Sequence, residues 1–196
     1  MKKIFTTLAL SIATLSASAT GLVVKYDWNH YQGTPNGANH NVYGYVGLKQ
    51  ATQIGTFDAG LQTTRTYTNG FDVDRANGYE IGYSYPLTIG KFGVIPRIAY
   101  GSMANINPAG TGFDLHARYY MPSIEVNYPL NSNLSTFVSF SHLNGLNSDS
   151  VARANRVQAG IDLTLTKTFV IRTAYSYNKF GDTNQQGVAL VGTYSF

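Results

Sequence analysis

The sequence predicts an all-β chain, and three features of its 196 residues support that prediction. Apolar and polar residues alternate along nearly every segment after Thr20, which is the period of a β-strand and not of a helix. Stretches rich in glycine, asparagine, aspartate and serine separate these segments. Only 12% of the residues are charged and 43% are hydrophobic, a composition unusual for a protein folded in water.

The first five predicted strands begin near residues 22, 41, 57, 79 and 92. Each has one apolar face, and the segment 79–85 alternates most clearly. In chain order these apolar faces carry Tyr26 with Trp28, Val42 with Val46, Phe57 with Leu61, Ile81 with Tyr83, and Ile98 with Tyr100.

The next five predicted strands begin near residues 120, 134, 157, 169 and 188. Every strand is about ten residues long, which is the length that crosses a bilayer when tilted. Pro96 and Pro122 face outward within strands. Each lacks the backbone N–H that would donate a hydrogen bond to the neighbouring strand, so we expect an irregularity at each. The apolar faces carry Ile124 with Val126, Val138 with Phe140, Ile161 with Leu163, Ile171 with Tyr175, and Val188 with Leu190.

The connections between these strands alternate in length. Short connections are predicted at 51–54, 88–91, 131–133 and 166–167, and longer ones near 32–40, 68–77, 102–115, 144–155 and 179–185. Short turns at one end and long loops at the other are typical of a transmembrane antiparallel up-and-down β-barrel. We expect about ten strands in a single domain over residues 20–196. Eight strands are the alternative, because a slip in one weak hairpin changes the count.

A secreted β-sandwich or a lipocalin-like soluble barrel has the same alternation. A soluble surface, however, needs roughly 25–35% charged residues. A barrel with its apolar face outward and its polar face inward is stable in hydrocarbon, because a closed barrel provides a hydrogen-bond partner for every backbone N–H and C=O group. Aromatic residues also lie where two interfacial girdles would fall. Those near short turns are Tyr85, Phe92, Tyr128, Phe169, Tyr194 and Phe196, and those near long loops are Trp28, Tyr67, Tyr79, Tyr100, Tyr120, Phe140, Tyr175 and Tyr177.

The first segment has the pattern of a secretory signal peptide. Lys2 and Lys3 precede an apolar run over 4–15, and small residues follow as far as Ala17-x-Ala19. We expect cleavage after Ala19, so that residues 1–19 are removed on export. The apolar run is too short for a transmembrane helix.

Two stretches give the chain a family resemblance. They are Gly78-Tyr79-Glu80-Ile81-Gly82-Tyr83-Ser84-Tyr85 and the C-terminal Gly192-Thr193-Tyr194-Ser195-Phe196. With them the chain resembles the small bacterial outer-membrane β-barrel proteins, the opacity-like and porin-like barrels. The resemblance implies location in the bacterial outer membrane. It also implies that Tyr194 and Phe196 form the signal read by the barrel-assembly machinery.

Charged residues of both signs fall on the face predicted to point inward. Either they line a constriction in a narrow pore, or they close the lumen with ion pairs. A ten-stranded barrel that also carries Tyr43, Tyr45, Met121 and Phe137 inward should be nearly full, so we expect a closed or very narrow lumen. The predicted charge network consists of Lys25, Asp27, Lys49, Asp58, Glu80, Arg97, Glu125, Asp162 and Arg172.

Three arginines, Arg65, Arg118 and Arg153, fall on the outward face near long loops. They could bind lipopolysaccharide phosphates, because arginine holds such groups bidentately. The alternative is that they are solvated charges at the loop bases.

The composition excludes several function classes. Without cysteine there is no disulfide, thiolate metal site or cysteine nucleophile. The net charge of +4 falls to +2 without Lys2 and Lys3, so nothing indicates nucleic-acid binding. No cofactor or metal site is predicted, and we expect a monomer.

We therefore expect a non-enzymatic outer-membrane barrel with a structural or surface-exposed role and at most a narrow pore. The alternatives are a small-solute porin, an adhesin that acts through its loops, and an outer-membrane protease. The last rests on Asp72 with Asp74 and Asp114 with His116, which resemble the paired residues of the omptin proteases.

Overall fold

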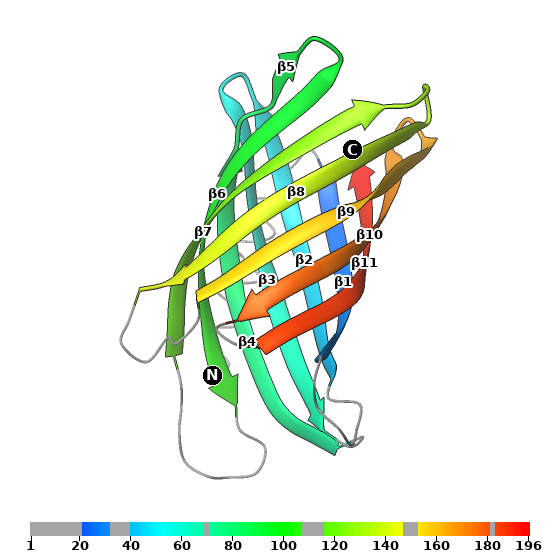
Figure 1. Cartoon of the computed structure of the whole chain (residues 1–196). Coiled ribbons are helices and arrows are strands. Elements are labelled where there is room, and N and C mark those ends of the chain that lie inside the picture. The colour runs from blue at the N-terminus through cyan, green and yellow to red at the C-terminus, as the bar shows by residue number, and fades with distance from the viewer. Residues whose placement is uncertain (1–20, 32–39, 69–70, 107–115, 147–152, 181–182) are drawn as a thin grey trace.

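The computed structural model describes residues 21–31, 40–68, 71–106, 116–146, 153–180 and 183–196. The predicted signal peptide lies outside these residues. No helix among them is long and apolar enough to cross a membrane. The described chain forms a closed antiparallel barrel. Strands that follow one another in the chain pair, except that β4 and β5 both pair with β6, and β1 pairs with β11 to close the wall (Figure 1).

The strands are numbered in chain order. One end of the barrel carries the short connections β2–β3, β7–β8 and β9–β10 and is called the turn end, and the opposite end is called the loop end. The strands are β1 (Gly21–Tyr31), β2 (His40–Thr52), β3 (Gly55–Thr68), β4 (Phe71–Ser84), β5 (Leu87–Ile89), β6 (Phe92–Ile106), β7 (His116–Pro129), β8 (Leu134–Gly145), β9 (Arg153–Thr166), β10 (Phe169–Phe180) and β11 (Thr183–Ser195).

Strands β4 and β5 occupy one position in the wall. Both pair with β6 in the same register, and Pro86, which has no N–H to donate, follows the end of β4. The backbone N–H of Tyr85 donates to the carbonyl oxygen of Pro96 at 3.1 Å within this break. The wall therefore has ten positions, and the prediction of an antiparallel barrel of about ten strands is confirmed.

The expected irregularities at Pro96 and Pro122 are both present. Pro96 lies opposite the break between β4 and β5. The β7–β8 ladder pairs Tyr120 with Asn144 and Ser123 with Ser141, but it has no pair at Met121 or Pro122. Two further register shifts, at Thr66/Tyr67 and at Phe169/Val170, are not predicted by the sequence.

The strands are longer than the sequence predicts, so several predicted loop boundaries are wrong. The expected loop 68–77 is almost entirely strand, because β3 runs to Thr68 and β4 begins at Phe71. The expected loop 144–155 likewise loses residues to β8 and β9. Beyond the apolar band both faces of a strand can be polar, so pairing continues there without the alternation that marks a strand in the sequence.

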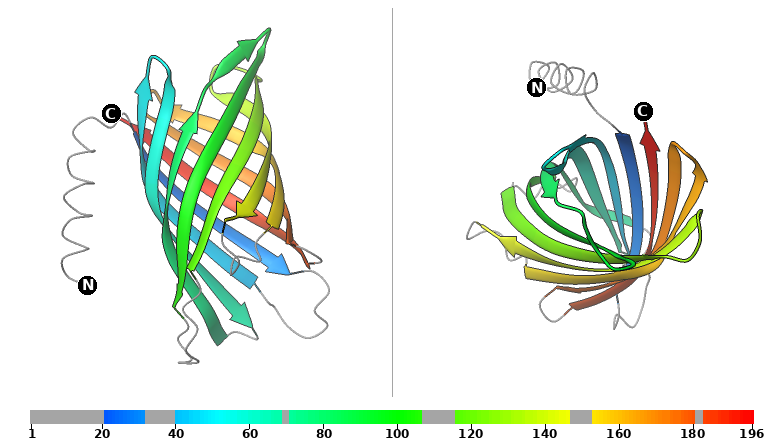
Figure 2. Two further views of the ribbon diagram at one scale, coloured as in Figure 1. Left: turned by 90° about the vertical axis from the view of Figure 1, so that its left-hand side faces the viewer. Right: turned by 90° about the horizontal axis from the view of Figure 1, so that it is seen from above.

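The wall is apolar outside and polar inside. Large apolar side chains remain exposed on the exterior, with Val46 at 53% and Val138 at 55%. Rings pair there at both ends, for example Phe92 with Tyr128, whose centroids are 5.3 Å apart, and His40 with Tyr67 at 4.7 Å. Asp27 and Ser176 are the largest fully buried side chains among the described residues; Asp27 lines the lumen, and Ser176 donates a hydrogen bond to Asn29, which also lines it. This distribution is the inverse of a soluble barrel and suits a hydrocarbon surrounding. Figure 2 shows the wall from the side and from the turn end.

Candidate functional site in the barrel lumen

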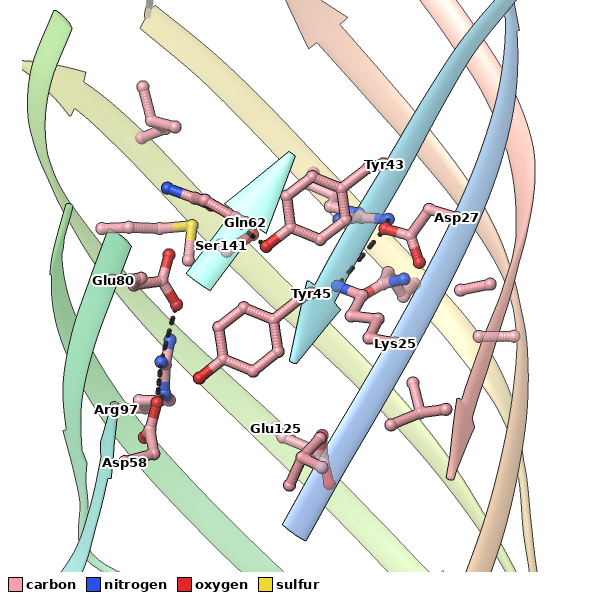
Figure 3. Close-up of a pocket in the computed structure, with 18 of the residues that line it drawn as sticks. Lys25, Asp27, Tyr43, Tyr45, Asp58, Gln62, Glu80, Arg97, Glu125 and Ser141 are labelled. Atoms are coloured by element: carbon pink, nitrogen blue, oxygen red, sulfur yellow. Dashed lines mark hydrogen bonds and ion pairs between the residues drawn. The ribbon is translucent and has the colours of Figure 1, made fainter. Parts of the chain in front are cut away.

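A cavity of about 790 Å³ occupies the lumen. Its lining reaches from Val170 and Thr193 near the turn end to Asn41 and Ala154 near the loop end. All nine charged residues of the predicted network line this cavity, and Figure 3 shows most of them with the tyrosines that project beside them. The structure thus places these nine residues on the face that the alternation predicts.

Arg97 on β6 joins carboxylates from two other strands. Its Nη2 lies 2.6 Å from Asp58 Oδ1 and 2.8 Å from Glu80 Oε1, and its Nε donates to Asp58 Oδ2 at 3.1 Å. Asp58 belongs to β3 and Glu80 to β4. A guanidinium that makes three such bonds is held against the wall and is not free to swing across the lumen.

A chain of hydrogen bonds extends from Glu80 to residues of β7, β3 and β2. The hydroxyl of Tyr119 on β7 donates to Glu80 Oε2 at 2.8 Å and accepts from Gln62 Nε2 at 2.7 Å. The hydroxyl of Tyr43 donates to Gln62 Oε1 at 3.1 Å. We call Arg97, Asp58, Glu80, Tyr119 and Gln62 the Arg97 network. Through Tyr43 it links β6 to β2.

A second group centres on Asp27, whose carboxylate is buried. Lys25 Nζ lies 3.3 Å from Asp27 Oδ2, and Arg156 Nη2 makes an ion pair with the same oxygen. Lys25 also lies over the ring of Tyr43, 5.3 Å from its centroid, and so reaches the end of the Arg97 network. Nearby, Asn29 Oδ1 accepts hydrogen bonds from Ser176 and Asn178, each at 3.0 Å.

Sequence reasoning missed Arg156. The residue lies between the predicted loop 144–155 and the strand predicted from residue 157, so the sequence pattern did not predict whether it points inward or outward. The observed strand β9 begins at Arg153, and Gln158 and Asp162 on the same strand also line the cavity. Counting back by two from Asp162 would have assigned Arg156 to the lumen.

Arg172 on β10 forms the third group. It makes bidentate pairs with Asp162, at 2.6 and 2.8 Å, and with Glu125, at 2.6 and 2.8 Å. Its guanidinium carbon lies 3.8 Å from the ring centroid of the buried Phe137. Arg172, Asp162, Glu125 and Phe137 form the Arg172 network, which joins strands β7 to β10 across the inner surface.

Two glycines let these side chains lie flat against the wall. A Cβ at Gly82 would stand 2.4 Å from Arg97 Nη2 and 2.6 Å from Asp58 Oδ2. A Cβ at Gly101 would stand 2.2 Å from the Tyr119 ring. The absence of side chains at these positions makes room for the Arg97 network.

The described lumen is balanced in charge. It holds five cations, namely the four predicted ones and Arg156, and five carboxylates. Because the acids divide among the three groups, positive and negative residues do not separate onto two facing walls. A weakly selective lumen follows from this arrangement.

The three outward arginines are not gathered at one place. Arg65, Arg118 and Arg153 lie toward the loop ends of β3, β7 and β9, which do not neighbour one another in the wall. Of the residues named for the protease alternative, Asp114 lies outside the described residues, and the side chains of Asp72, Asp74 and His116 are not described. Tyr194 and Phe196 lie at the turn end with ring centroids 5.6 Å apart.

Comparison with known proteins supports the fold. No protein-family profile and no curated protein sequence matches this chain. Its structure is similar to the β domain of the Bordetella autotransporter BrkA, with a TM-score of 0.57 and 12% identity over 91% of this chain and 100% of that chain. It is similar to the transport unit of the autotransporter AIDA-I from Escherichia coli, with a TM-score of 0.53 and 11% identity over 91% and 90%. The translocator domain of NalP from Neisseria meningitidis matches with a TM-score of 0.50 and 10% identity over 100% and 98%.

These likenesses show a shared fold. Together with the apolar exterior, the closed wall and the polar lumen, they define the chain as a bacterial outer-membrane β-barrel protein.

Proposed function

We propose that this protein is a non-enzymatic outer-membrane barrel with a structural or surface-exposed role, and that its own ion pairs keep the lumen narrow. The observation that carries the proposal is the pairing of lumen charges across strands that do not adjoin. Arg97 binds Asp58, Arg172 binds Glu125 and Arg156 binds Asp27, and each pair joins non-neighbouring positions of the wall. Ion pairs that cross-link non-neighbouring strands favour a rigid barrel over one that lets solutes pass through its lumen.

The energetics support the same conclusion. Removing one partner of a buried ion pair leaves an uncompensated charge and costs about 3–5 kcal/mol. A large solute would have to displace such pairs to pass, and it would have to replace several hydrogen bonds at once. Water and small ions would not have to break these pairs to enter the cavity.

Single-channel conductance in planar bilayers tests the proposal. Wild-type barrel, shown to be folded by its heat-modifiable gel mobility, should give no steps or very small ones with little ion preference. Arg97→Ala removes a cation and leaves Asp58 and Glu80 in place, so it should produce larger steps with cation preference. Glu80→Ala should have a smaller effect, because Arg97 keeps Asp58.

Arg153→Ala is the matched control, since it removes one cation from the exterior of β9 and should leave conductance unchanged. Wild-type steps comparable to those of a 16-stranded general porin in the same chamber would overturn the proposal, because barrels of that size hold an open channel.

A small-solute porin is the second candidate, and the cavity favours it. The lining includes residues near both ends of the barrel, and its polar groups could pass a small hydrophilic solute. Swelling of proteoliposomes in neutral sugars distinguishes the two functions. Uptake of a monosaccharide at a rate that rises with protein content supports the porin, whereas swelling no faster than in protein-free liposomes supports the rigid barrel.

A further inference from the structure

The outer surface carries basic residues toward the loop end. Every aspartate and glutamate whose side chain the structure describes lines the lumen. The alternation of each strand instead directs five cations outward at this level. They are Arg65 on β3, Arg75 on β4, Arg118 on β7, Arg153 on β9 and Lys179 on β10.

Arg65 and Arg75 differ from the other three because they are direct partners in the β3–β4 register. Side chains at such positions start about 4.5–5.5 Å apart, and like charges there are destabilising. Among the described residues neither guanidinium has an ion pair with an acid. Arg75 Nε is buried and has no hydrogen-bond partner in the part of the chain that the structure describes. No acidic side chain that the structure describes therefore neutralises this pair.

The surroundings of this pair place it at the level of lipid headgroups. On its loop side the ring of His40 stacks on that of Tyr67, and the ring centroid of Trp28 lies 6.1 Å from that of His40. On its turn side the hydroxyl of Thr63 donates to Asn77 Oδ1 at 2.8 Å, and the exposed Leu61 and Tyr79 follow. Amphipathic aromatic side chains mark the boundary between hydrocarbon and headgroups.

We propose that Arg65 and Arg75 together bind a phosphate group on the headgroup of lipopolysaccharide, the phosphorylated lipid of the outer leaflet. A phosphate monoester carries about two negative charges and three acceptor oxygens, so it can neutralise both guanidinium groups and accept from Arg75 Nε. Arg118, Arg153 and Lys179 stand on other strands and contribute single contacts to neighbouring lipid molecules. This site is independent of the lumen.

The test measures the thermal midpoint at which the folded, heat-modifiable form is lost in a neutral detergent. Titrating lipopolysaccharide should raise the midpoint of the wild-type barrel, and dephosphorylated lipopolysaccharide should not. The double variant Arg65→Gln/Arg75→Gln should need at least tenfold more lipopolysaccharide for the same rise. Lys91→Gln/Lys167→Gln removes the same charge from exposed turns at the opposite end and should behave as wild type.

The sign of a single substitution distinguishes binding from a structural role. Without lipopolysaccharide, Arg65→Gln should raise the midpoint, because it removes a like-charge contact. In saturating lipopolysaccharide it should lower the midpoint relative to wild type. The proposal is overturned if the Arg65/Arg75 double variant titrates like wild type, if the Lys91/Lys167 control loses as much response, or if inorganic phosphate alone reproduces the shift, since the ligand would then be a free anion.

Discussion

Arginines in the lumen and on the outer surface of this barrel have opposite surroundings. Arg97 and Arg172 each contact two carboxylates supplied by other strands. Arg65 instead faces another arginine, Arg75, across the β3–β4 ladder. The interior thus carries its own counter-ions, whereas no described acidic side chain pairs with Arg65 or Arg75 on the exterior. Arginine thus cross-links strands through ion pairs in the lumen, whereas on the outer surface Arg65 lies beside a second positive charge.

The largest effect should come from Arg172→Ala, because it leaves Glu125 and Asp162 close together without their cation. We expect a loss of about 3–5 kcal/mol in the free energy of unfolding. Urea unfolding of the barrel in lipid vesicles, followed by gel mobility, measures it. The triple variant Arg172→Ala/Glu125→Gln/Asp162→Asn should recover part of the loss. A triple variant no more stable than the single one would show that Arg172 stabilises the barrel through its packing on Phe137 and not through its charge.

A lysine in the apolar band should have the next largest effect. Val138→Lys on β8 places a cation on the exterior, far from headgroup anions, and should cost about 2–4 kcal/mol. Val42→Lys is the matched substitution, because Val42 is the register partner of Arg65 near the headgroup level. It should cost less in vesicles that contain lipopolysaccharide. Equal costs at both positions would mean that depth in the membrane does not govern the exterior charges.

Gly82→Ala tests the close contact behind the Arg97 network. The added methyl group must displace Arg97 or Asp58, and we expect a cost of about 1–3 kcal/mol with larger single-channel steps. Gly192→Ala is the control, since a Cβ there would meet Phe169 only at 3.7 Å, an ordinary contact. Conductance that rises equally in both variants would remove the special role given to Gly82.

The smallest effect should come from Arg153→Gln alone. Arg153 is exposed on β9 and pairs in register with Asn144, so a stability change of about 0.5 kcal/mol or less is expected. Its lipopolysaccharide titration should shift far less than that of the Arg65/Arg75 double variant. A shift as large as in the double variant would show that the five exterior cations act as one surface and not through a paired site.

The alternation of apolar and polar residues was sufficient to predict which way most side chains point. Lys25 and Asp27 face the lumen and Trp28 faces outward because successive residues of a strand alternate between its two faces. The same rule failed at Arg75 and Arg156, which lie in or beside the predicted loops 68–77 and 144–155. Strands that extend beyond the apolar band have no alternating pattern to mark them, so their faces could not be assigned from composition.

By itself, then, the sequence determined the class of fold, the inverted polarity of the wall and nine of the lumen charges, because these follow from a local period of two and from a low charge content. Only the tertiary structure decided which charges meet. Arg172 and Asp162 are register partners on adjacent strands, but Glu125 reaches Arg172 from β7. Such contacts depend on the curvature and closure of the whole wall, which bring distant strands together around one lumen.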